Sequence, residues 1–422
     1  MQPKSIYTTD VVVLGGGTAG SIAAIAASRA GARVLLLERT GILGGTMTIG
    51  GVCFPGLFFA WGRQIIAGIG WEAVCRAADA GKTALAPVVY DCHRHWEQQT
   101  HLNPFAYAQT LDELCRESET EILFHTSLAD AKEEADGVTL LCAGLEGTIC
   151  VHAKIAIDAS GDATLARVLG YPVEKSAELQ PSTLFAHLTG YRPDDVPKET
   201  VEQAVKAAIA DGRLPSHLEP YRLSACFQRQ VLDFHTLTMA DVDTSAGRSR
   251  LEQAARQNLA QVLSVFRTLP ACASMQIASF APTCGVRESV RILGQTRVTE
   301  TDYLRGRVYQ DAISYAFYPI DQHKTQGIRM IYPAEGVVPT VPLGALLPVG
   351  TRRLLCAGRI LSSDTGANSA LRVQAVCMAC GQAAGVAASV CAQTNTTPAS
   401  SNLCTIREIL QAQGAILPAL IP

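Results

Sequence analysis

VVVLGGGTAGSIAAIAASRAGARVLLLE, residues 11–38, is the stretch of the chain that decides the fold. It begins with an apolar run at 11–14, continues through the pattern G-x-G-x-x-G at 15–20 and an alanine-rich segment at 21–30, and closes with a second apolar run, 34–37, and an acid. This order predicts a strand, a tight turn, a helix and a second strand, which together form a parallel βαβ unit. Such a unit is the nucleotide-binding half of a doubly wound α/β sheet.

Each glycine of this turn has its own physical role. Gly15 permits the tight turn, Gly17 lets the backbone approach a pyrophosphate, and Gly20 lets the helix pack closely on the strand. The N-terminus of the helix offers N–H donors and a positive dipole to phosphate. Glu38, at the end of the second strand, can accept hydrogen bonds from the 2′- and 3′-hydroxyls of an adenosine ribose. Its charge disfavours a 2′-phosphate, so NADP is disfavoured and NAD and FAD remain.

Three later segments favour FAD over NAD. A small loop at 44–46, Gly-Gly-Thr, follows the second strand and suits a cofactor that extends past its pyrophosphate into a flavin. Residues 121–152 carry turn signals at 136–137 and 146–147 and predict a β-meander. After it, 155–162 reads as a strand, a tight turn and the start of a helix. A dinucleotide domain interrupted by such a meander resembles the glutathione-reductase-type FAD fold.

The C-terminal part of the chain completes this domain. Residues 354–358 predict its last strand, and the segment after Ala367 predicts a helix with small residues on nearly every face. We expect the N-terminus of this helix to point at the pyrimidine edge of the isoalloxazine, where its dipole stabilises negative charge. The small residues allow close approach through a packed interior. Arg372 is the single charge within the helix, and because a buried arginine needs a partner, either an acid or the flavin contacts it.

The composition limits the class of protein. The chain has 422 residues, which suggests two to three domains of roughly 150 residues each. Hydrophobic residues make up 48% and charged residues 17%, a balance that argues against disorder. A net charge of −3 gives no electrostatic footprint for nucleic acid. The first ten residues lack the apolar segment of a signal peptide, so we expect a cytoplasmic protein, off the membrane, with its 14 cysteines reduced and mostly buried.

Six stretches, taken in order, resemble the FAD-dependent oxidoreductase family of bacterial flavoproteins, a group distantly similar to the tRNA-uridine-modifying flavoprotein. They are VVVLGGGTAG, LLLERTGILGG, IDASGDATLA, GVRESVRILG, DAISYAFYPIDQH and AGRILSSDTGANSALRVQAVCMACGQAAG, between residue 11 and about residue 389. The combination of GVRES, YPIDQH and AGR is more specific than any one piece. The resemblance implies a discontinuous Rossmann-like FAD domain of glutathione-reductase type with an inserted α+β substrate domain.

The motifs and the resemblance together predict which residues contact FAD. Asp162 occupies a position similar to that of the acid after the family's D-A-S-G-D strand. Arg359 occupies a position similar to that of the arginine at the end of the family's A-G-R strand. The predicted contacts are Gly15, Gly17, Thr18, Ala19, Gly20, Glu38, Arg39, Gly44, Gly45, Thr46, Ala129, Ser160, Gly161, Asp162, Arg359, Ala367 and Arg372.

The sequence departs from the family pattern at two places. Val290 stands where the family often has the first of two arginines, and 364–367, Asp-Thr-Gly-Ala, stands where it often has T-H-E-A. We therefore expect the flavin side of the site to be kept and the substrate side to differ.

The domain organisation follows from where the nucleotide motifs lie. Residues 1–175 and 340–422 are expected to form the FAD-binding domain, and residues 176–339 the substrate domain between its two parts. Helices are predicted at 198–212 and 246–267, and the latter is amphipathic, with its charged face toward solvent.

The candidate catalytic residues lie between 284 and 323. Arg287 and Glu288 are adjacent, so in a strand they face opposite ways and each has its own partner. Arg287 is a candidate for binding a carboxylate, a sugar oxygen or the flavin, or for holding a structural network. His323 is the first choice for a general base, because its unperturbed pKa lies near neutral pH. Asp321 either orients it or caps a turn.

Three cysteine and histidine patterns have simpler explanations than chemistry. Cys53 lacks the partner cysteine of a flavin disulfide reductase, and the C-x-x-C at 377–380 lies inside the buried helix without a second pair for zinc. His93, His95 and His101 are spaced loosely for zinc, with no nearby cysteine. We therefore expect no metal. Because the chain has no second G-x-G-x-x-G, we expect no NAD(P)H domain, and electrons enter from an organic substrate.

Two functions follow from these residues. The first is an FAD-dependent oxidoreductase that takes hydride from a C–H bond of a small polar substrate, such as a sugar or hydroxy acid, and passes electrons to oxygen, a quinone or a carrier. The second is an RNA-modifying or RNA-binding flavoprotein. The acidic charge balance favours the first. The sequence does not indicate the substrate, the electron acceptor or the oligomeric state.

Overall fold

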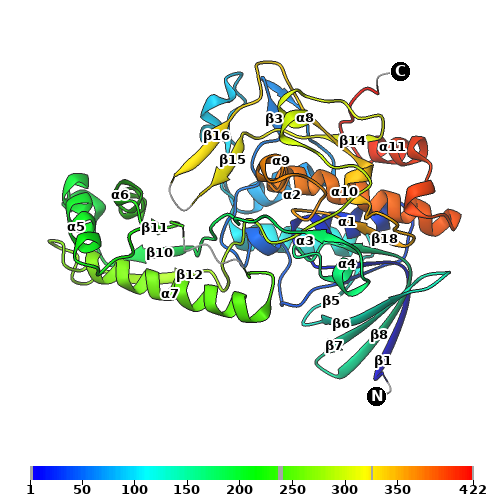
Figure 1. The fold of residues 1–422 in the computed structure, drawn as a ribbon, viewed down its shortest axis with the longest axis horizontal. Helices are drawn as coiled ribbons and strands as arrows, with labels where there is room; N and C mark the ends of the chain where they lie inside the picture. Colours follow the sequence, from blue (N-terminus) through cyan, green and yellow to red (C-terminus); the bar gives the residue numbers. More distant parts are fainter. Residues whose placement is uncertain (1–2, 236–240, 325–326, 421–422) are drawn as a thin grey trace.

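The computed structural model describes residues 3–235, 241–324 and 327–420. Figure 1 shows a main body, in which helices pack on a large sheet, and a smaller lobe drawn in green beside it.

The main body contains a seven-stranded sheet in the order β5-β2-β1-β8-β7-β6, with β18 also paired to β8. The pairs among β5, β2, β1, β8 and β18 are parallel, whereas β8-β7 and β7-β6 are antiparallel. The predicted βαβ unit and β-meander are therefore confirmed, as is an α/β fold with a parallel sheet. The strands are β1 (Ser5–Leu14), β2 (Val34–Leu37), β5 (Glu121–Leu123), β6 (Ser127–Glu133), β7 (Val138–Gly144), β8 (Gly147–Asp158) and β18 (Leu354–Cys356).

The parallel strands end together at one edge of the sheet. Leu14 is paired with both Leu37 and Asp158, and Cys356 is paired with Asp158. Because ligands of open α/β sheets bind outside the carboxyl ends of the strands, this edge is the expected place for a cofactor. It brings together the glycine turn, Glu38 and the loop after β8.

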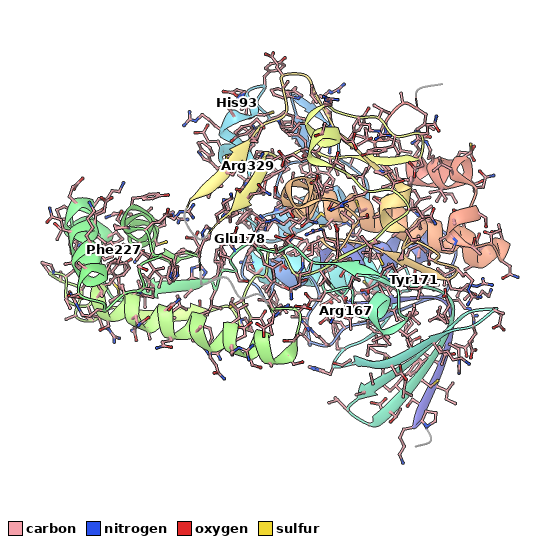
Figure 2. The ribbon with its side chains drawn as sticks, viewed as in Figure 1. His93, Arg167, Tyr171, Glu178, Phe227 and Arg329 are labelled. Carbon is pink, nitrogen blue, oxygen red and sulfur yellow. The ribbon has the colours of Figure 1, made fainter. Side chains whose placement is uncertain are left out.

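The smaller lobe has a hydrophobic core of its own, whose residues run from Leu179 to Val286. Figure 2 labels Phe227 within this lobe. The fully buried ring of Phe227 meets Phe266 edge to face, with ring centroids 5.2 Å apart. The helices predicted at 198–212 and 246–267 are confirmed as α5 and α7. The elements of the lobe are α5 (Lys198–Ala210), α6 (Pro220–Arg229), α7 (Ser245–Phe266), β10 (Ala186–Thr189), β11 (Val231–Leu232) and β12 (Gln276–Phe280).

Apolar side chains between Val298 and Leu347 belong to the core of the main body. The segment 176–339, predicted as the substrate domain, therefore contributes to both cores. Its elements in the main body are β13 (Arg291–Ile292), α8 (Glu300–Leu304), β14 (Ala312–Tyr315), β15 (Ile320–His323) and β16 (Ile328–Ile331). Further helices and strands are β3 (Phe59–Ala60), β4 (Arg63–Gln64), α2 (Ile69–Ala80), α3 (Pro104–Glu117), α4 (Thr164–Val168), β9 (Val173–Glu174), β17 (Thr340–Pro342) and α11 (Leu403–Ala412).

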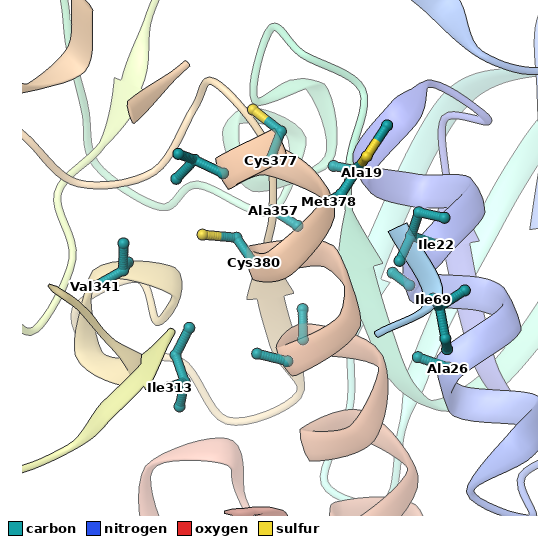
Figure 3. Close-up of a cluster of buried hydrophobic side chains, with 14 of the residues drawn as sticks. Ala19, Ile22, Ala26, Ile69, Ile313, Val341, Ala357, Cys377, Met378 and Cys380 are labelled. Atoms are coloured by element: carbon teal, nitrogen blue, oxygen red, sulfur yellow. The ribbon is translucent and has the colours of Figure 1, made fainter. Parts of the chain in front are cut away.

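Helix α10 (Gln374–Thr394) runs through the main body beside α1 (Thr18–Arg29), as Figure 3 shows. A Cβ atom added to Gly381 would lie 2.2 Å from the carbonyl oxygen of Ala19, and one added to Gly385 would lie 2.1 Å from that of Ala23. The glycines of α10 therefore let the two backbones touch. By length and composition α10 could cross a membrane. However, 94% of its most apolar 18-residue stretch is buried inside the protein, as expected for a core helix.

Candidate active site

The turn between β1 and α1 contains the three glycines of the motif. Two of them leave no room for a side chain, and the third does. Gly15 has a φ of +102°, and a Cβ there would lie 2.7 Å from the carbonyl oxygen of Ala159. A Cβ on Gly20 would lie 1.8 Å from the carbonyl oxygen of Gly15. At Gly17, by contrast, the nearest atom would be Cα of Gly45, 3.9 Å away. Backbone geometry and packing thus require Gly15 and Gly20, whereas Gly17 leaves the backbone accessible.

Glu38 is buried at the end of β2 and is bonded to the turn that it faces. Its Oε2 accepts a hydrogen bond of 2.7 Å from the backbone N–H of Gly16. Its Oε1 accepts bonds of 2.8 Å from the backbone N–H and the hydroxyl of Thr40. The predicted ribose-binding acid therefore also fixes the shape of the glycine turn.

The loop at 44–46 lies directly against the glycine turn. The N–H of Gly44 donates to the carbonyl of Gly16 over 2.9 Å, and the hydroxyl of Thr18 donates to the carbonyl of Gly44 over 3.2 Å. A Cβ on Gly45 would come within 2.9 Å of Cα of Gly17. The two glycine-containing segments therefore form one continuous surface of backbone.

The loop after β8 is held by a partly buried ion cluster around Asp162. Its carboxylate accepts from Arg359 at 2.8 Å, from Arg248 at 3.1 Å and from the hydroxyl of Ser289 at 2.8 Å. Burial alone would raise the pKa of Asp162, but the two arginines outweigh it and lower the pKa to about 2. Arg359 also donates to the carbonyl of Gly161 over 2.6 Å, so this arginine ties β18 to the loop.

These segments line a single cavity of about 1280 Å³. A typical pocket for one ligand has roughly 300–1,000 Å³, so this cavity has room for a dinucleotide and a small substrate. The predicted site residues that line it are Gly15, Gly17, Thr18, Ala19, Glu38, Arg39, Gly45, Thr46, Ser160, Gly161, Asp162, Arg287, His323, Arg359 and Arg372.

Four predicted contacts do not belong to the cavity lining. Gly20 and Gly44 support the glycine turn from behind, where a Cβ would strike backbone or side-chain atoms. Ala129 is exposed at an irregularity of β6, and the neighbouring residues 126–128 line the cavity in its place. Ala367 is fully buried inside a helix.

The helix predicted after Ala367 is two helices. The first, α9 (Thr365–Leu371), is capped by Asp364, whose Oδ1 accepts from the N–H of Ala367 over 2.8 Å. The chain then becomes extended at Val373, with φ −66° and ψ 142°, and α10 starts at Gln374 without a side-chain cap. Because Val373 and Gln374 line the cavity, the helix N-terminus there belongs to α10 and not to α9, although the N–H of Ala375 already donates to the carbonyl of Pro55 over 2.7 Å.

The end of the cavity near the glycine turn fits FAD. The open backbone at Gly17 and the start of α1, which also lacks a side-chain cap, offer N–H donors to a pyrophosphate. Glu38 stands at the strand end where an adenosine ribose would lie, and the N–H groups that begin α10 suit the electron-rich edge of a flavin.

The other end of the cavity is polar and carries two arginines. Nη1 of Arg287 donates to the carbonyl of Pro181 over 2.7 Å and to the hydroxyl of Thr183 over 2.8 Å. Arg372 donates to the side-chain oxygen of Gln180 and to the carbonyl of Asp321, both over 3.1 Å. All of these acceptors are uncharged. Burial, followed by the positive charge of Arg372, lowers the pKa of Arg287 to about 9.

Asp321, His323 and His235 form a chain of hydrogen bonds at this end. Nε2 of His323 lies 2.8 Å from Oδ2 of Asp321, and its Nδ1 lies 2.7 Å from Nε2 of His235. Burial, followed by the charge of Arg287, lowers the pKa of His323 to about 3, although Asp321 opposes this shift. These surroundings depress the pKa of His323 below that of a free imidazole, and both of its ring nitrogens already have partners. Its predicted contact with Asp321 is present.

One oxygen of Asp321 has no partner among the described residues. Its Oδ1 is buried and accepts no hydrogen bond from any part of the chain that the structure describes. Burial would raise the pKa of Asp321, but His323, Arg372 and Arg287 together lower it below the ordinary range, so the group is ionised at neutral pH. A buried unpaired oxygen on a charged group is costly, and a hydrogen-bond donor placed beside it would stabilise it.

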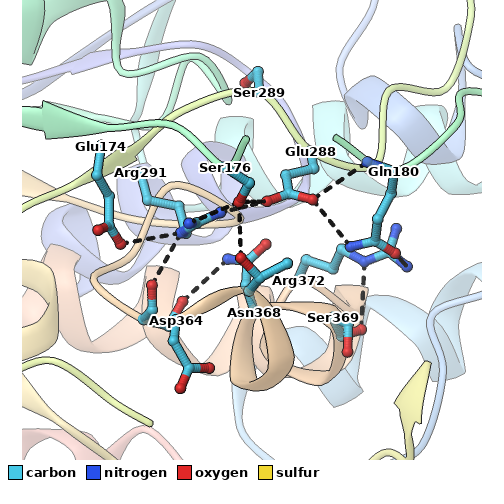
Figure 4. Close-up of polar contacts among 12 residues, drawn as sticks. Glu174, Ser176, Gln180, Glu288, Ser289, Arg291, Asp364, Asn368, Ser369 and Arg372 are labelled. Atoms are coloured by element: carbon cyan, nitrogen blue, oxygen red, sulfur yellow. Dashed lines mark hydrogen bonds and ion pairs between the residues drawn. The ribbon is translucent and has the colours of Figure 1, made fainter. Parts of the chain in front are cut away.

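A buried ion pair beneath this end escaped the sequence-based reasoning. Nη1 of Arg291 lies 2.5 Å from Glu288, and the two side chains are 3% and 1% exposed (Figure 4). Glu288 also accepts from the backbone and side chain of Gln180. Gln180 in turn accepts from the backbone N–H of His323 over 3.1 Å, as it does from Arg372. As predicted, Glu288 and the adjacent Arg287 have separate partners.

Two further residues in this region have explicable roles. Val290, which stands where the family often has an arginine, is buried in a hydrophobic cluster and is 3% exposed. Burial raises the pKa of the Cys53 thiol to about 12, so it is protonated and packs as a small apolar group.

Two residues of the polar end, His235 and Gln180, could not be recognised as site residues from the sequence. They contact His323 but lie 88 and 143 positions away from it in the chain.

The chain matches the family described as FAD dependent oxidoreductase over residues 10–410, and it belongs to that family. Its cofactor is FAD, and it is an enzyme of the oxidoreductase class. Over 175 residues it is 30% identical to digeranylgeranylglycerophospholipid reductase 1 of Methanosphaera stadtmanae, a match that covers 38% of this chain and 40% of that reductase.

Solved structures with a similar chain trace are more distant. A geranylgeranyl bacteriochlorophyll reductase-like protein from Thermoplasma acidophilum is 12% identical with a TM-score of 0.48, over 97% of this chain and 83% of that one. The p-nitrophenol 4-monooxygenase of Pseudomonas putida is 13% identical with a TM-score of 0.41, over 96% and 84% of the two chains.

Proposed function

We propose that this FAD-dependent oxidoreductase oxidises a small polar organic substrate, such as a sugar or hydroxy acid, by removing hydride from a C–H bond. The observation that carries the proposal is Oδ1 of Asp321, a buried carboxylate oxygen without a partner among the described residues, on a side chain that lines the same cavity as the FAD-binding residues. Loss of hydride from an alcohol carbon requires an acceptor for the hydroxyl proton, and an ionised carboxylate within the cavity is such an acceptor.

The chain's own residues would hold the cofactor at the other end. The glycine turn and the start of α1 suit the pyrophosphate, Glu38 the adenosine ribose, and the start of α10 the flavin. Bound FAD supplies the acceptor for the hydride and its electron pair. We expect the electrons to pass afterwards to oxygen, a quinone or a carrier.

Asp321 and His323 divide the proton chemistry between them. As the C–H bond breaks and the C=O bond forms, the hydroxyl proton moves to Oδ1 of Asp321. Because an ionised carboxylate can only accept, neutral His323 donates from Nε2 to Oδ2 and holds the carboxylate in position. His323 is then a positioning residue, and the role of base that its sequence context suggested passes to Asp321.

Nearby rings help to keep water from this proton acceptor. Tyr318 is buried beside Asp321 and packs edge to face on His95, with ring centroids 4.9 Å apart. Gln99 fixes the hydroxyl of Tyr318 with a hydrogen bond of 2.8 Å. A dry environment strengthens the electrostatic interactions that hold and orient a polar substrate.

A second candidate is the reduction of an isoprenoid double bond. The archaeal relative is named a reductase of a digeranylgeranyl lipid. Three apolar side chains of the cavity lining, Trp96, Ile328 and Met330, favour this candidate. The charged groups at the polar end favour oxidation of a polar substrate, because an isoprenoid chain would leave them desolvated and unpaired.

Anaerobic mixing separates the two candidates. The FAD-bound protein is mixed without oxygen with a panel of sugars, sugar acids and hydroxy acids, and the visible absorbance of the flavin is followed. We expect at least one of these compounds to bleach it. If none does, and a geranylgeranyl lipid reoxidises the chemically reduced protein, oxidation of a polar substrate is rejected in favour of the second candidate.

We also propose that the FAD domain is of the glutathione-reductase type and that the protein works in the cytoplasm on a small molecule, without nucleic acid or membrane. The meander of β6, β7 and β8, which lies in the chain between parallel strands β5 and β18, supports this type of FAD domain. The net charge of −3 favours a small-molecule substrate over RNA.

A further inference from the structure

The polar end of the cavity contains more positive than negative charge. Arg287 and Arg372 both line it, and within the described residues neither has a carboxylate oxygen within ion-pair distance of its guanidinium nitrogens. Two other arginines nearby do have acidic partners. Arg291 is paired with Glu288 at 2.5 Å, and Arg359 with Asp162 at 2.8 Å. The fold therefore supplies acids to Arg291 and Arg359 and leaves Arg287 and Arg372 to neutral oxygens.

Leaving these two arginines without an acid is electrostatically unfavourable. Burial lowers the pKa of both groups, and for Arg287 the positive charge of Arg372 adds to that effect. The charge of Asp321 opposes the shift in both arginines, and that of Glu288 opposes it in Arg372, but neither reverses it. Asp321 is the carboxylate at this end, and its Oδ2 is already bonded to His323. Two desolvated like charges and one partly engaged acid form a site that a further negative charge would stabilise.

The donors of both guanidinium groups are only partly used. Each guanidinium has five N–H donors, and the two contacts of Arg287 both come from Nη1. For Arg372 the contacts come from Nη2 and Nε. Arginine is suited to binding carboxylates, because its planar fork of donors matches both carboxylate oxygens.

We propose that Arg287 and Arg372 bind a carboxylate of the substrate, and that the substrate is a small carboxylic acid whose hydroxyl or amino group donates to Oδ1 of Asp321. This inference rests on the proposed function and narrows its substrate class. A hydroxy acid and an amino acid share this chemistry, since each places a hydrogen-bond donor beside a carboxylate. A neutral sugar does not share it.

Binding of a carboxylate would also make Asp321 a better base. Arg372 and Arg287 are among the groups that lower the pKa of Asp321. An anion bound between them would offset their positive charge, so Asp321 would take a proton more readily with substrate present than without it. The same arginines would then both recognise the substrate and prepare the proton acceptor.

The test compares carboxylates with related compounds that lack a carboxylate on the FAD-bound protein. Propionate, lactate and alanine are titrated anaerobically against propionamide, lactamide and propane-1,2-diol, with the flavin spectrum as the readout of binding and bleaching. We expect the carboxylates to perturb the spectrum and the amides to do so at least roughly tenfold more weakly. Arg287→Gln and Arg372→Gln should each weaken carboxylate binding by roughly ten- to hundredfold, and Arg287→Lys by less.

Each outcome of this test has a distinct meaning. Carboxylates that bind without ever bleaching the flavin would support the subsite and reject oxidation of the acid. Equal binding of acids and amides, no binding of any carboxylate, or unchanged carboxylate affinity in both glutamine variants would overturn the subsite. Variants that shift the flavin reduction potential but keep the carboxylate affinity would show that the arginines serve the cofactor, which also overturns it. The comparison of acids with amides on the wild-type protein stands even if a variant fails to fold.

Discussion

Replacing Gly17 with alanine separates cofactor binding from folding within a single turn. The backbone at Gly17 has φ −67° and ψ −178°, which alanine adopts without strain. The added Cβ would lie 3.9 Å from the nearest atom, Cα of Gly45, so nothing in the protein must move. We expect the apoprotein to keep its free energy of unfolding to within about 1 kcal/mol, because alanine and glycine differ by no more than this at the N-cap of a helix.

The same methyl group stands where a pyrophosphate would approach the backbone. If it removes one charge-assisted hydrogen bond, FAD binding weakens by about 1.5–3 kcal/mol, or roughly ten- to hundredfold. Titration of apoprotein with FAD measures this loss, and urea unfolding of the apoprotein measures stability. Gly20→Ala is the matched control, because its Cβ would lie 1.8 Å from the carbonyl oxygen of Gly15 and should disrupt the fold itself. Wild-type FAD affinity in Gly17→Ala would refute the placement of the cofactor at this turn.

Three further changes have defined outcomes. Glu38→Ala should weaken FAD binding roughly ten- to hundredfold by calorimetry, since it removes a buried charged acceptor, and unchanged affinity would show that Glu38 does not touch the ribose. Arg291→Met should lower the free energy of unfolding in urea by about 3–5 kcal/mol, because it leaves Glu288 charged and unpaired in the core. Replacing both partners with apolar residues should recover most of that loss, and a double variant as unstable as the single one would argue against this cause. The pKa of Asp162 is lowered from 3.8 to about 2, so its ionised form favours the folded state. That contribution, about 2 kcal/mol, is present above pH 4 and disappears as the pH falls toward 2. Asp162→Asn should reduce this loss of stability between pH 4 and pH 2. An unchanged loss in the variant would show that Asp162 is not its cause.

The parts of the fold that follow local rules could be predicted from the sequence. The strand, turn, helix and strand of residues 11–37, the meander after residue 121 and the helix α7 each have a regular pattern of apolar residues or an evident turn signal. In these segments local preference and tertiary packing agree, so the pattern identifies the element.

The break between α9 and α10 and the polar end of the site could not be predicted in this way. The break falls at Val373, with no glycine or proline to signal it, and tertiary contacts override the helical pattern there. The pKa of His323 depends on burial and on Arg287, which only the fold brings beside it. The free oxygen of Asp321 is likewise a property of packing, because a sequence shows a carboxyl group but not which of its oxygens lacks a partner.

The rate of flavin reduction in Asp321→Asn tests the proposed proton acceptor most directly. Asparagine has the shape of aspartate and can still accept a hydrogen bond from His323, but it cannot take the substrate's proton. Once a reducing substrate is in hand, anaerobic stopped-flow mixing compares this variant with the wild type and with His323→Asn, after the flavin spectrum of each has shown that FAD is bound. We predict that Asp321→Asn slows reduction by roughly 10²–10⁴-fold and that His323→Asn slows it less. Reduction of Asp321→Asn at the wild-type rate would contradict the assignment of Asp321 as the group that takes the proton.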